Sequence, residues 1–326
     1  MYWDEFNYID FNIMNEYSKL HSVMIGFTNF NKEIKDLVPV NSVFRDNYSN
    51  NKIPNDEEVE LEIYELIKKL QENNILVYRP TKIVNPSIER NNQLYTRDIG
   101  FVIKNTLFIP KMILPIRKAE LFGLTDLINK INKKQNIIFL NKDDCFIEGG
   151  DVMQHKDKIF VGIGPRTNMN GFNLLKEYID KNFKEFTMIP IKHECIHLDC
   201  CLNIIYDNTA IICENYMIDY PDEINKMNLI KVSKQESDYM LTNILCIGDK
   251  KLIVNNGVQN KRVNKILEDN GFTLIKVKFN NTNLFGGSFR CISMPLARYD
   301  ILPHNGMCKR CDMKLISCIC RNPIPY

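Results

Sequence analysis

The sequence predicts an α/β fold built from one repeated unit, a β-hairpin followed by a helix and a further strand. A hairpin is indicated where an apolar stretch runs into a short polar turn and a second apolar stretch follows. Four segments have this form: IGFVIKNTLFIP from Ile99, DVMQHKDKIFVG from Asp151, LNIIYDNTAIIC from Leu202 and NILCIGDKKLIV from Asn243. Their turns recur about every 40–50 residues, which is typical of repeat architectures. We expect a closed cyclic arrangement; the alternative is an ordinary α/β fold whose hairpins recur by chance.

Helix-like stretches separate the hairpins. Apolar residues at i, i+3, i+4 spacing predict helices over 56–74, 117–134, 170–184 and 260–271. A short strand pattern follows each of them, and these patterns read ILVYRP, NIIFL, FTMIPI and TLIKVKF. The segment LHSVMIGF from Leu20 predicts one more strand.

The composition favours a globular, cytoplasmic protein. The chain has 326 residues, of which 44% are hydrophobic, and this is enough for a large core. A net charge of +2 gives no general electrostatic reason to expect nucleic acid, and no apolar run approaches the roughly 20 residues of a membrane span. The eleven cysteines are scattered, which suits a reducing compartment. The first residues, MYWDEFNYIDFN, are unlike a signal peptide.

Polar clusters stand shortly before three of the hairpin turns. They are TRD at 96–98, EGGD at 148–151 and HLD at 197–199, while FGGSFRC places Cys291 after the last repeated unit. Equivalent positions of a cyclic repeat meet at one end of the common axis. The residues that we expect to meet there are Asp98, Glu148, His197, Asp199 and Cys291.

These residue types suit chemistry at a guanidinium carbon. A thiol is a nucleophile when a neighbouring group activates it, and histidine can serve as acid and base. Carboxylates hold a guanidinium by paired, charge-assisted hydrogen bonds. Each residue alone has a simpler interpretation: Asp98 as a strand cap, His197 as a hydrogen-bonded core histidine, Cys291 as a small buried hydrophobe.

The order of the motifs resembles that of the guanidino-modifying (pentein) superfamily. The similarity runs from NEYSKLHSVMIG at Asn15 to CISMPLARYD, which ends at Asp300. The superfamily includes arginine deiminases, arginine dihydrolases, dimethylarginine dimethylaminohydrolases and glycine amidinotransferases. The resemblance implies a five-bladed α/β propeller as a catalytic domain over 1–304, with no catalytic cofactor.

The resemblance also implies a role for each residue. Cys291 would be the nucleophile and His197 the general acid and then base. Asp98 and Glu148 would bind the guanidinium, and Asp199 would assist beside the histidine. The residues expected to contact the rest of the substrate are Arg117, Arg166 and Asp151. For the two arginines, a solvated surface position is the alternative.

The expected activity is hydrolysis of the guanidino group of arginine or a close analogue. It would proceed through an amidino-thioether on cysteine and give citrulline or ornithine plus ammonia. One alternative is an amidinotransferase, which moves the amidino group to an amine. A non-enzymatic alternative is a propeller that binds an arginine-like ligand or the ribosome. The expected partner is therefore a small guanidino compound.

The last segment, 305–326, is rich in cysteine. Cys308, Cys311, Cys318 and Cys320 have the spacing C-x2-C-x6-C-x-C, and four thiolates can close a tetrahedral structural zinc site. The segment also resembles the cysteine-rich opening of DTW-domain proteins, which modify RNA, and no other part of the chain suggests nucleic acid. The alternative is a flexible, thiol-rich tail.

Overall fold

The structure of the chain is a computed structural model that describes residues 9–29, 42–85, 87–88, 92–131 and 135–300. The cysteine-rich segment, with Cys308, Cys311, Cys318 and Cys320, lies outside the described residues. Among the described helices, none combines the length and the apolar character that a membrane span requires.

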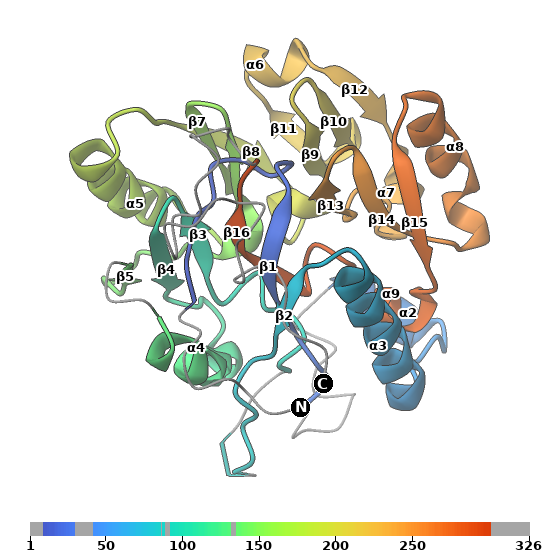
Figure 1. The fold of residues 1–326 in the computed structure, drawn as a ribbon, viewed down its shortest axis with the longest axis horizontal. Coiled ribbons are helices and arrows are strands. Elements are labelled where there is room, and N and C mark those ends of the chain that lie inside the picture. The colour runs from blue at the N-terminus through green and yellow to red at the C-terminus, as the bar shows by residue number, and fades with distance from the viewer. Residues whose placement is uncertain (1–8, 30–41, 86, 89–91, 132–134, 301–326) are drawn as a thin grey trace, which may run out of the picture.

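The described strands form five separate small sheets in a mixed α/β fold (Figure 1). Four of them contain an antiparallel hairpin and a strand parallel to its second member, so the predicted hairpins are confirmed. The strands of these four sheets are β3 (Phe101–Ile103), β4 (Thr106–Pro110) and β5 (Asn136–Leu140); β6 (Val152–His155), β7 (Lys158–Ile163), β8 (Thr187–His193) and β11 (Met217–Asp219); β9 (Leu202–Tyr206), β10 (Thr209–Ile212) and β12 (Asn228–Lys231); and β13 (Leu245–Gly248), β14 (Lys251–Asn255) and β15 (Thr273–Val277).

The fifth sheet joins the two ends of the described chain. Its strands are β1 (Leu20–Ile25), β2 (Leu76–Tyr78) and β16 (Ser293–Arg298). The first strand runs antiparallel to the last and parallel to the second, so the strand predicted at Leu20 is confirmed. This sheet therefore has the same pattern as the other four, but it is assembled from both ends of the sequence.

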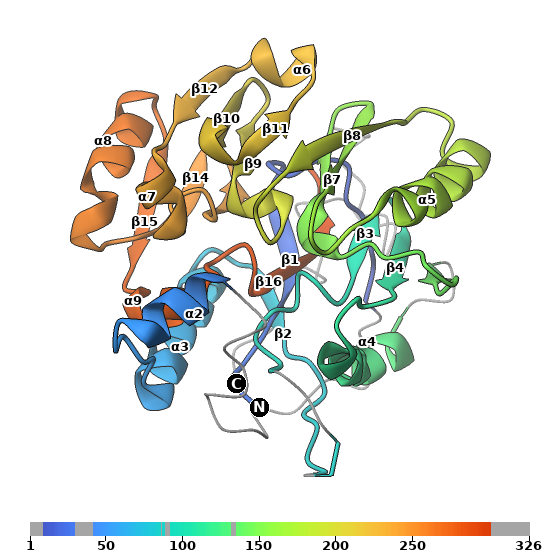
Figure 2. The same cartoon turned by 180° about the vertical axis from the view of Figure 1, so that it is seen from behind.

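Helices connect the strands, and the longer ones lie at the periphery of the molecule (Figure 1). The α-helices are α2 (Ser42–Ser49), α3 (Asp56–Glu72), α4 (Thr125–Asn129), α5 (Met169–Asn182), α6 (Asp222–Asn225), α7 (Lys234–Asp238), α8 (Lys261–Asp269) and α9 (Asn280–Leu284). The view from behind shows α2 and α9 beside α3 (Figure 2). The helices predicted over 56–74, 170–184 and 260–271 are confirmed by α3, α5 and α8.

The longest helix shows why these segments fold as they do. Asn55 accepts a hydrogen bond from the Glu58 N–H at 3.0 Å, which caps the start of α3. Val59, Ile63 and Leu66 are fully buried on one face. This face packs with residues of β1, β14 and β15 in one apolar cluster, and burial of such side chains supplies most of the stability of a helix in a protein.

The structure differs from the predicted helix over 117–134. A 3₁₀ helix, η2 (Pro115–Leu124), replaces most of it and leads into the single turn and a half of α4. Three residues per turn place Arg117, Glu120 and Gly123 on one face, and all three are buried. The unit that contains β9 and β10 also lacks a long helix, because the α-helix between β10 and β12 is α6, which has four residues.

Candidate active site

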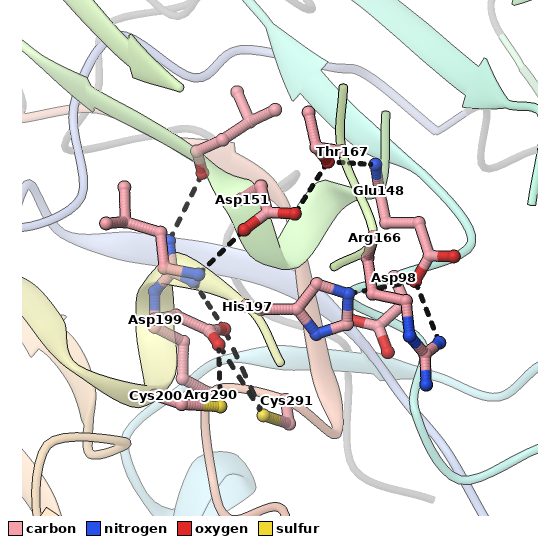
Figure 3. Close-up of polar contacts among 12 residues, drawn as sticks. Asp98, Glu148, Asp151, Arg166, Thr167, His197, Asp199, Cys200, Arg290 and Cys291 are labelled. Atoms are coloured by element: carbon pink, nitrogen blue, oxygen red, sulfur yellow. Dashed lines mark hydrogen bonds and ion pairs between the residues drawn. The ribbon is translucent and has the colours of Figure 1, made fainter. Parts of the chain in front are cut away.

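Four of the candidate residues, Asp98, Glu148, His197 and Cys291, lie in the segment just before the strand that begins the hairpin of a sheet. Asp98 precedes β3, and Glu148 precedes the 3₁₀ turn η3 (Gly149–Asp151) that leads into β6. His197 precedes the turn η4 (Leu198–Cys200) before β9, and Cys291 precedes β16. The four side chains are 0–3% exposed. The repeated fold thus brings equivalent positions of different sheets to one place (Figure 3).

Hydrogen bonds link these segments from one sheet to the next. The Gly149 N–H donates to the carbonyl oxygen of Asp98 at 3.3 Å. The Leu198 N–H donates to the Asp151 carboxylate at 2.7 Å. The segments before β3, β6 and β9 are therefore held at fixed distances from one another.

The same linkage continues through the remaining two sheets. The side-chain amide of Asn243 donates to the carbonyl oxygen of Asp199 at 3.2 Å, and the Arg290 N–H donates to that of Asn243 at 3.2 Å. The Arg97 N–H then donates to the carbonyl oxygen of Cys291 at 3.1 Å. Five hydrogen bonds thus form a closed cycle through all five segments, which we call the hydrogen-bond ring.

His197 lies between two buried carboxylates. Its Nε2 is 2.8 Å from Glu148 Oε2, and its Nδ1 is 3.6 Å from Asp98 Oδ1. A Cβ on Gly150 would lie 2.7 Å from the imidazole and 2.9 Å from Asp98, so glycine is required for this close packing. Asp98 Oδ1 receives no hydrogen bond from the described residues, which leaves a buried acceptor available to a ligand.

This arrangement sets the charge of the histidine. Burial disfavours the imidazolium, but the Asp98 carboxylate and the hydrogen bond with Glu148 outweigh it and raise the pKa of His197 to about 10. Burial likewise disfavours the Glu148 carboxylate, yet His197 and Arg117 lower its pKa to about 2. The pair is therefore an imidazolium and a carboxylate at neutral pH, and the histidine is ready to donate a proton.

Arg117 is buried and bound to three carboxylates. Its guanidinium lies 2.8 Å from Asp98 and 3.5 Å from Glu148, and it also bonds Glu120 at 2.8 Å. The ring of Tyr95 lies 5.7 Å from the guanidinium carbon. The alternative of a solvated surface arginine is thus excluded. The two acids that we expect to hold a substrate already contact a guanidinium of the protein itself.

Arg166 and its neighbour Thr167 lie on the other side of Glu148. Arg166 is 4% exposed, so its solvated-surface alternative is also wrong, and its guanidinium is 3.5 Å from the Glu148 carboxylate. The Thr167 hydroxyl accepts the Glu148 N–H at 3.1 Å and donates to Asp151 at 2.6 Å. These contacts fix the Glu148 backbone.

Asp151 is completely buried and fully engaged with the protein. In addition to the bonds from Leu198 and Thr167, its Oδ1 lies 3.0 Å from Nε2 of His193. Both carboxylate oxygens therefore have protein partners. The structure shows Asp151 as the residue that joins the segment of Glu148 to the segment of His197.

Cys291 lies in a closely packed loop. Its N–H donates to Asn243 Oδ1 at 3.0 Å, and its Sγ is 3.8 Å from Asp199 Oδ1. A Cβ on Gly287 would lie 2.5 Å from the Tyr95 ring and 3.2 Å from the Cβ of Cys291, so this glycine allows the loop to pass close to the thiol.

A buried ion pair with Arg290 holds the Asp199 carboxylate in position. Arg290 donates to its Oδ2 at 2.6 Å and to Glu16 at 3.1 Å. Burial disfavours the Arg290 charge, but Glu16 and Asp199 raise its pKa above the ordinary arginine value. Asp199 thus lies beside the thiol and this arginine, and the structure gives it no direct hydrogen bond to His197 among the described residues.

Sequence reasoning missed Asn243, Arg290, Glu120 and Cys200. A signal existed for Asn243, because it precedes β13 as Asp98, Asp151 and Asp199 precede their own strands. Arg290 and Cys200 adjoin candidate residues in the sequence. Glu120 could be inferred only from the i, i+3 spacing of a 3₁₀ helix.

Within the part of the chain that the structure describes, two groups of side chains are close enough to hold a cation. Asp98, Glu148 and His197 form one, and Asp199, Cys200 and Cys291 form the other. The raised pKa of His197 opposes a metal in the first group, since a protonated imidazole has no lone pair to donate.

The fold is shared with solved structures of guanidino-modifying enzymes. An inosamine-phosphate amidinotransferase of Streptomyces griseus aligns with a TM-score of 0.73 at 16% identity, covering 90% of this chain and 98% of its own. The dimethylarginine dimethylaminohydrolase of Pseudomonas aeruginosa aligns with a TM-score of 0.66 at 15% identity, covering 85% and 99%. These likenesses show the fold alone. Together with the family model that matches most of the chain, they define a guanidino-modifying enzyme of the pentein superfamily.

The particular family follows from the sequence comparisons. The family model described as N,N dimethylarginine dimethylhydrolase, eukaryotic, matches residues 32–298, and the chain belongs to this family. The uncharacterized protein YkgA of Bacillus subtilis is 36% identical over 238 residues, which are 72% of this chain and 78% of YkgA. An arginine deiminase of Borreliella burgdorferi is 25% identical over 255 residues; the match covers 64% of this chain and only 62% of the deiminase.

The unusual pKa of His197 is directly measurable. We expect its imidazole NMR signals to titrate near pH 10, and replacement Glu148→Gln to lower that pKa towards 6.5, because it removes the hydrogen-bonded negative charge. Glu185→Gln, at an exposed ion pair with Lys104, is the matched control and should leave the value unchanged. The imidazole signals that disappear in the His197→Gln variant are those of His197. A wild-type imidazole that titrates between pH 6 and 7 would contradict this charge state.

The raised pKa of His197 also makes the stability of the folded chain depend on pH. The folded pKa of about 10 lies above the unfolded value of 6.5. The contribution of the His197 imidazolium is therefore fully present below pH 6.5 and is lost as pH rises towards 10. The difference in free energy of unfolding between wild type and His197→Gln should shrink over that range.

Proposed function

We propose that the protein is a cysteine-dependent hydrolase of the guanidino group of arginine or a close analogue. The main support is that Asp98 and Glu148 are buried beside His197 and both form ion pairs with the guanidinium of Arg117, at 2.8 Å and 3.5 Å. Buried carboxylates of this kind favour a planar cation that forms paired hydrogen bonds. The open acceptor at Asp98 Oδ1 offers a place for a further N–H group.

In the first step Cys291 attacks the substrate. Its sulfur adds to the guanidino carbon, and the C–N bond to the leaving nitrogen breaks. The His197 imidazolium gives that nitrogen a proton, so ammonia or an amine leaves. The amidino group remains on Cys291 as a thioether. The Asp98 and Glu148 carboxylates hold the positive charge in place throughout.

In the second step water completes the reaction. His197, now neutral, takes a proton from water, and the resulting hydroxide adds to the amidino carbon. The C–S bond then breaks, which restores the Cys291 thiolate and the imidazolium. Side chains perform both steps, and no cofactor enters.

The remaining predicted residues have supporting roles in this proposal. Arg117 and Arg166 bracket the Glu148 carboxylate and would orient it, and their remaining N–H groups are candidates to bind the substrate carboxylate. Asp151 positions the His197 segment through Leu198. Asp199 holds the Cys291 thiol and accepts its proton.

Membership of the dimethylarginine family bears on the substrate. An N-methylated arginine would release a methylated amine and citrulline, whereas arginine itself would release ammonia. The related P. aeruginosa enzyme was solved with citrulline. We favour water as the acceptor, with transfer of the amidino group to an amine as the alternative, and a cytoplasmic location.

We also propose that the five sheets are the blades of a five-bladed propeller. The support is the common pattern of the sheets and the cyclic order of the hydrogen-bond ring. The catalytic domain would be residues 1–304, and residues 305–326 would form a separate tail.

Replacement Cys291→Ala should lower turnover more than roughly a thousandfold, because the nucleophile is lost. Intact mass of acid-quenched wild type during turnover should show an amidino adduct, which peptide mapping places on Cys291. Cys213→Ala, another buried cysteine, is the control and should keep both. Turnover retained in Cys291→Ala would end the covalent mechanism.

Labelling the guanidino carbon distinguishes hydrolysis from transfer. We expect the label of arginine or dimethylarginine to stay in citrulline, or to be released in the dihydrolase case, whether or not glycine or lysine is added. Chromatography of the products gives the answer. Label found on the added amine would establish the amidinotransferase alternative instead.

For the tail we propose a structural zinc ion on Cys308, Cys311, Cys318 and Cys320. The full chain should then bind about one equivalent of zinc, by the four-thiolate stoichiometry. A chain that ends at Asn305 should lose the metal and retain turnover, since the proposed catalytic residues all precede it. Equal metal content in the two proteins would argue for a free thiol tail.

A further inference from the structure

A second thiol, which the proposed reaction does not use, lies against the nucleophile. The Cys200 Sγ is 3.6 Å from Asp199 Oδ1, the same oxygen that lies 3.8 Å from the Cys291 Sγ. The two sulfurs and this carboxylate lie within 4.8 Å of one another. Figure 3 shows the sulfurs next to each other beside Asp199. Both cysteines are buried, reduced thiols.

The two sulfurs must approach further before a bond can form between them. A disulfide requires a separation of about 2.05 Å, which rotation of the two side chains must supply. Cys200 ends the short turn η4, and Cys291 follows the loop of Gly286 and Gly287. The hydrogen bond with Cys291 and burial together hold the pKa of Cys200 well above the usual value, so Cys200 stays a protonated thiol.

We propose that Cys200 is a resolving cysteine, which forms a reversible disulfide with Cys291 after a hydroperoxide has oxidised the nucleophile. The oxidised enzyme is inactive, because the sulfur that attacks the guanidino carbon is occupied. A dithiol restores it. This regulation rests on the proposed function, since that function makes Cys291 the nucleophile.

The chemistry balances in two steps. The Cys291 thiol gives its proton to Asp199, and its sulfur attacks one oxygen of the hydroperoxide. The O–O bond breaks, the departing alkoxide or hydroxide takes that proton and leaves as an alcohol or water, and Cys291 becomes a sulfenic acid. The Cys200 sulfur then attacks the Cys291 sulfur. Its proton passes through Asp199 to the departing hydroxide, and water and the disulfide are formed. Without a nearby thiol, further peroxide would take the sulfenic acid to the irreversible sulfinic acid.

The neighbouring cysteines are oriented differently. The Cys201 Sγ donates to the carbonyl oxygen of Leu198 at 3.4 Å. Cys195 interacts with Cys201, and this contact and burial raise the pKa of Cys195. Cys201, equally buried and adjacent in sequence, is therefore a matched control for Cys200.

The test is peptide mapping of the full chain after treatment with hydrogen peroxide and alkylation of free thiols. Trypsin releases Cys291 in CISMPLAR and Cys200 in the peptide 193–226. We expect these two peptides to be cross-linked in wild type and in Cys201→Ser, and separate in Cys200→Ser. In Cys200→Ser, Cys291 should carry the sulfinic acid.

Turnover supplies the second measurement, each variant being compared with its own untreated activity. After dithiothreitol, wild type and Cys201→Ser should recover most of their activity, and Cys200→Ser several-fold less. A cross-link that persists in Cys200→Ser, or Cys291 oxidised to sulfinic acid in wild type, would overturn the proposal. The mapping needs no turnover. If the cross-link forms but the protein is inactive on every guanidino compound, the proposed function is contradicted and the disulfide between Cys200 and Cys291 is not.

Discussion

The site depends on the hydrogen-bond ring. Its five bonds run from sheet to sheet through Gly149, Leu198, Asn243, Arg290 and Arg97, and they return to the starting segment. A buried backbone group that lost its partner would cost about 1–3 kcal/mol, which opposes the shift of any one segment alone. The ring therefore fixes the distances between residues that are far apart in the sequence.

Inside the hydrogen-bond ring, buried positive side chains are paired with buried carboxylates. His197 is held by Glu148 and Asp98, and Arg290 is held by Asp199 and Glu16. Removing one partner of such a buried pair typically costs about 3–5 kcal/mol, because the other charge is left unpaired. The two pairs also lie at different parts of the site: one contains the imidazolium and its carboxylates, and the other lies beside the Cys291 thiol.

The repeated unit could be predicted from the sequence because its signals are local. Each hairpin has an apolar–turn–apolar pattern, and α3 and α5 have apolar residues at helical spacing. The 3₁₀ helix at Arg117 could not be predicted, since its geometry is set by the buried contact with Glu120 and the carboxylates beyond. The burial of Arg117 and Arg166 was likewise hidden, because a sequence does not show which charges will find partners inside. The proximity of Cys200 to Cys291 depends on two sheets meeting, which only the tertiary structure shows.

The sheet made from both ends of the chain has a consequence for biosynthesis. Arg298 bonds the backbone of Ser18, 280 residues earlier, and β16 must pair with β1 before the last sheet exists. Contacts of such long range form late, and an emerging chain folds from its N-terminal end. During translation β1 is therefore an unpaired edge along one side, and the site is incomplete until Cys291 has left the ribosome. A chain truncated by premature termination would contain Asp98 and Glu148 without Cys291, and with an exposed strand edge it would be a substrate for chaperones and proteases.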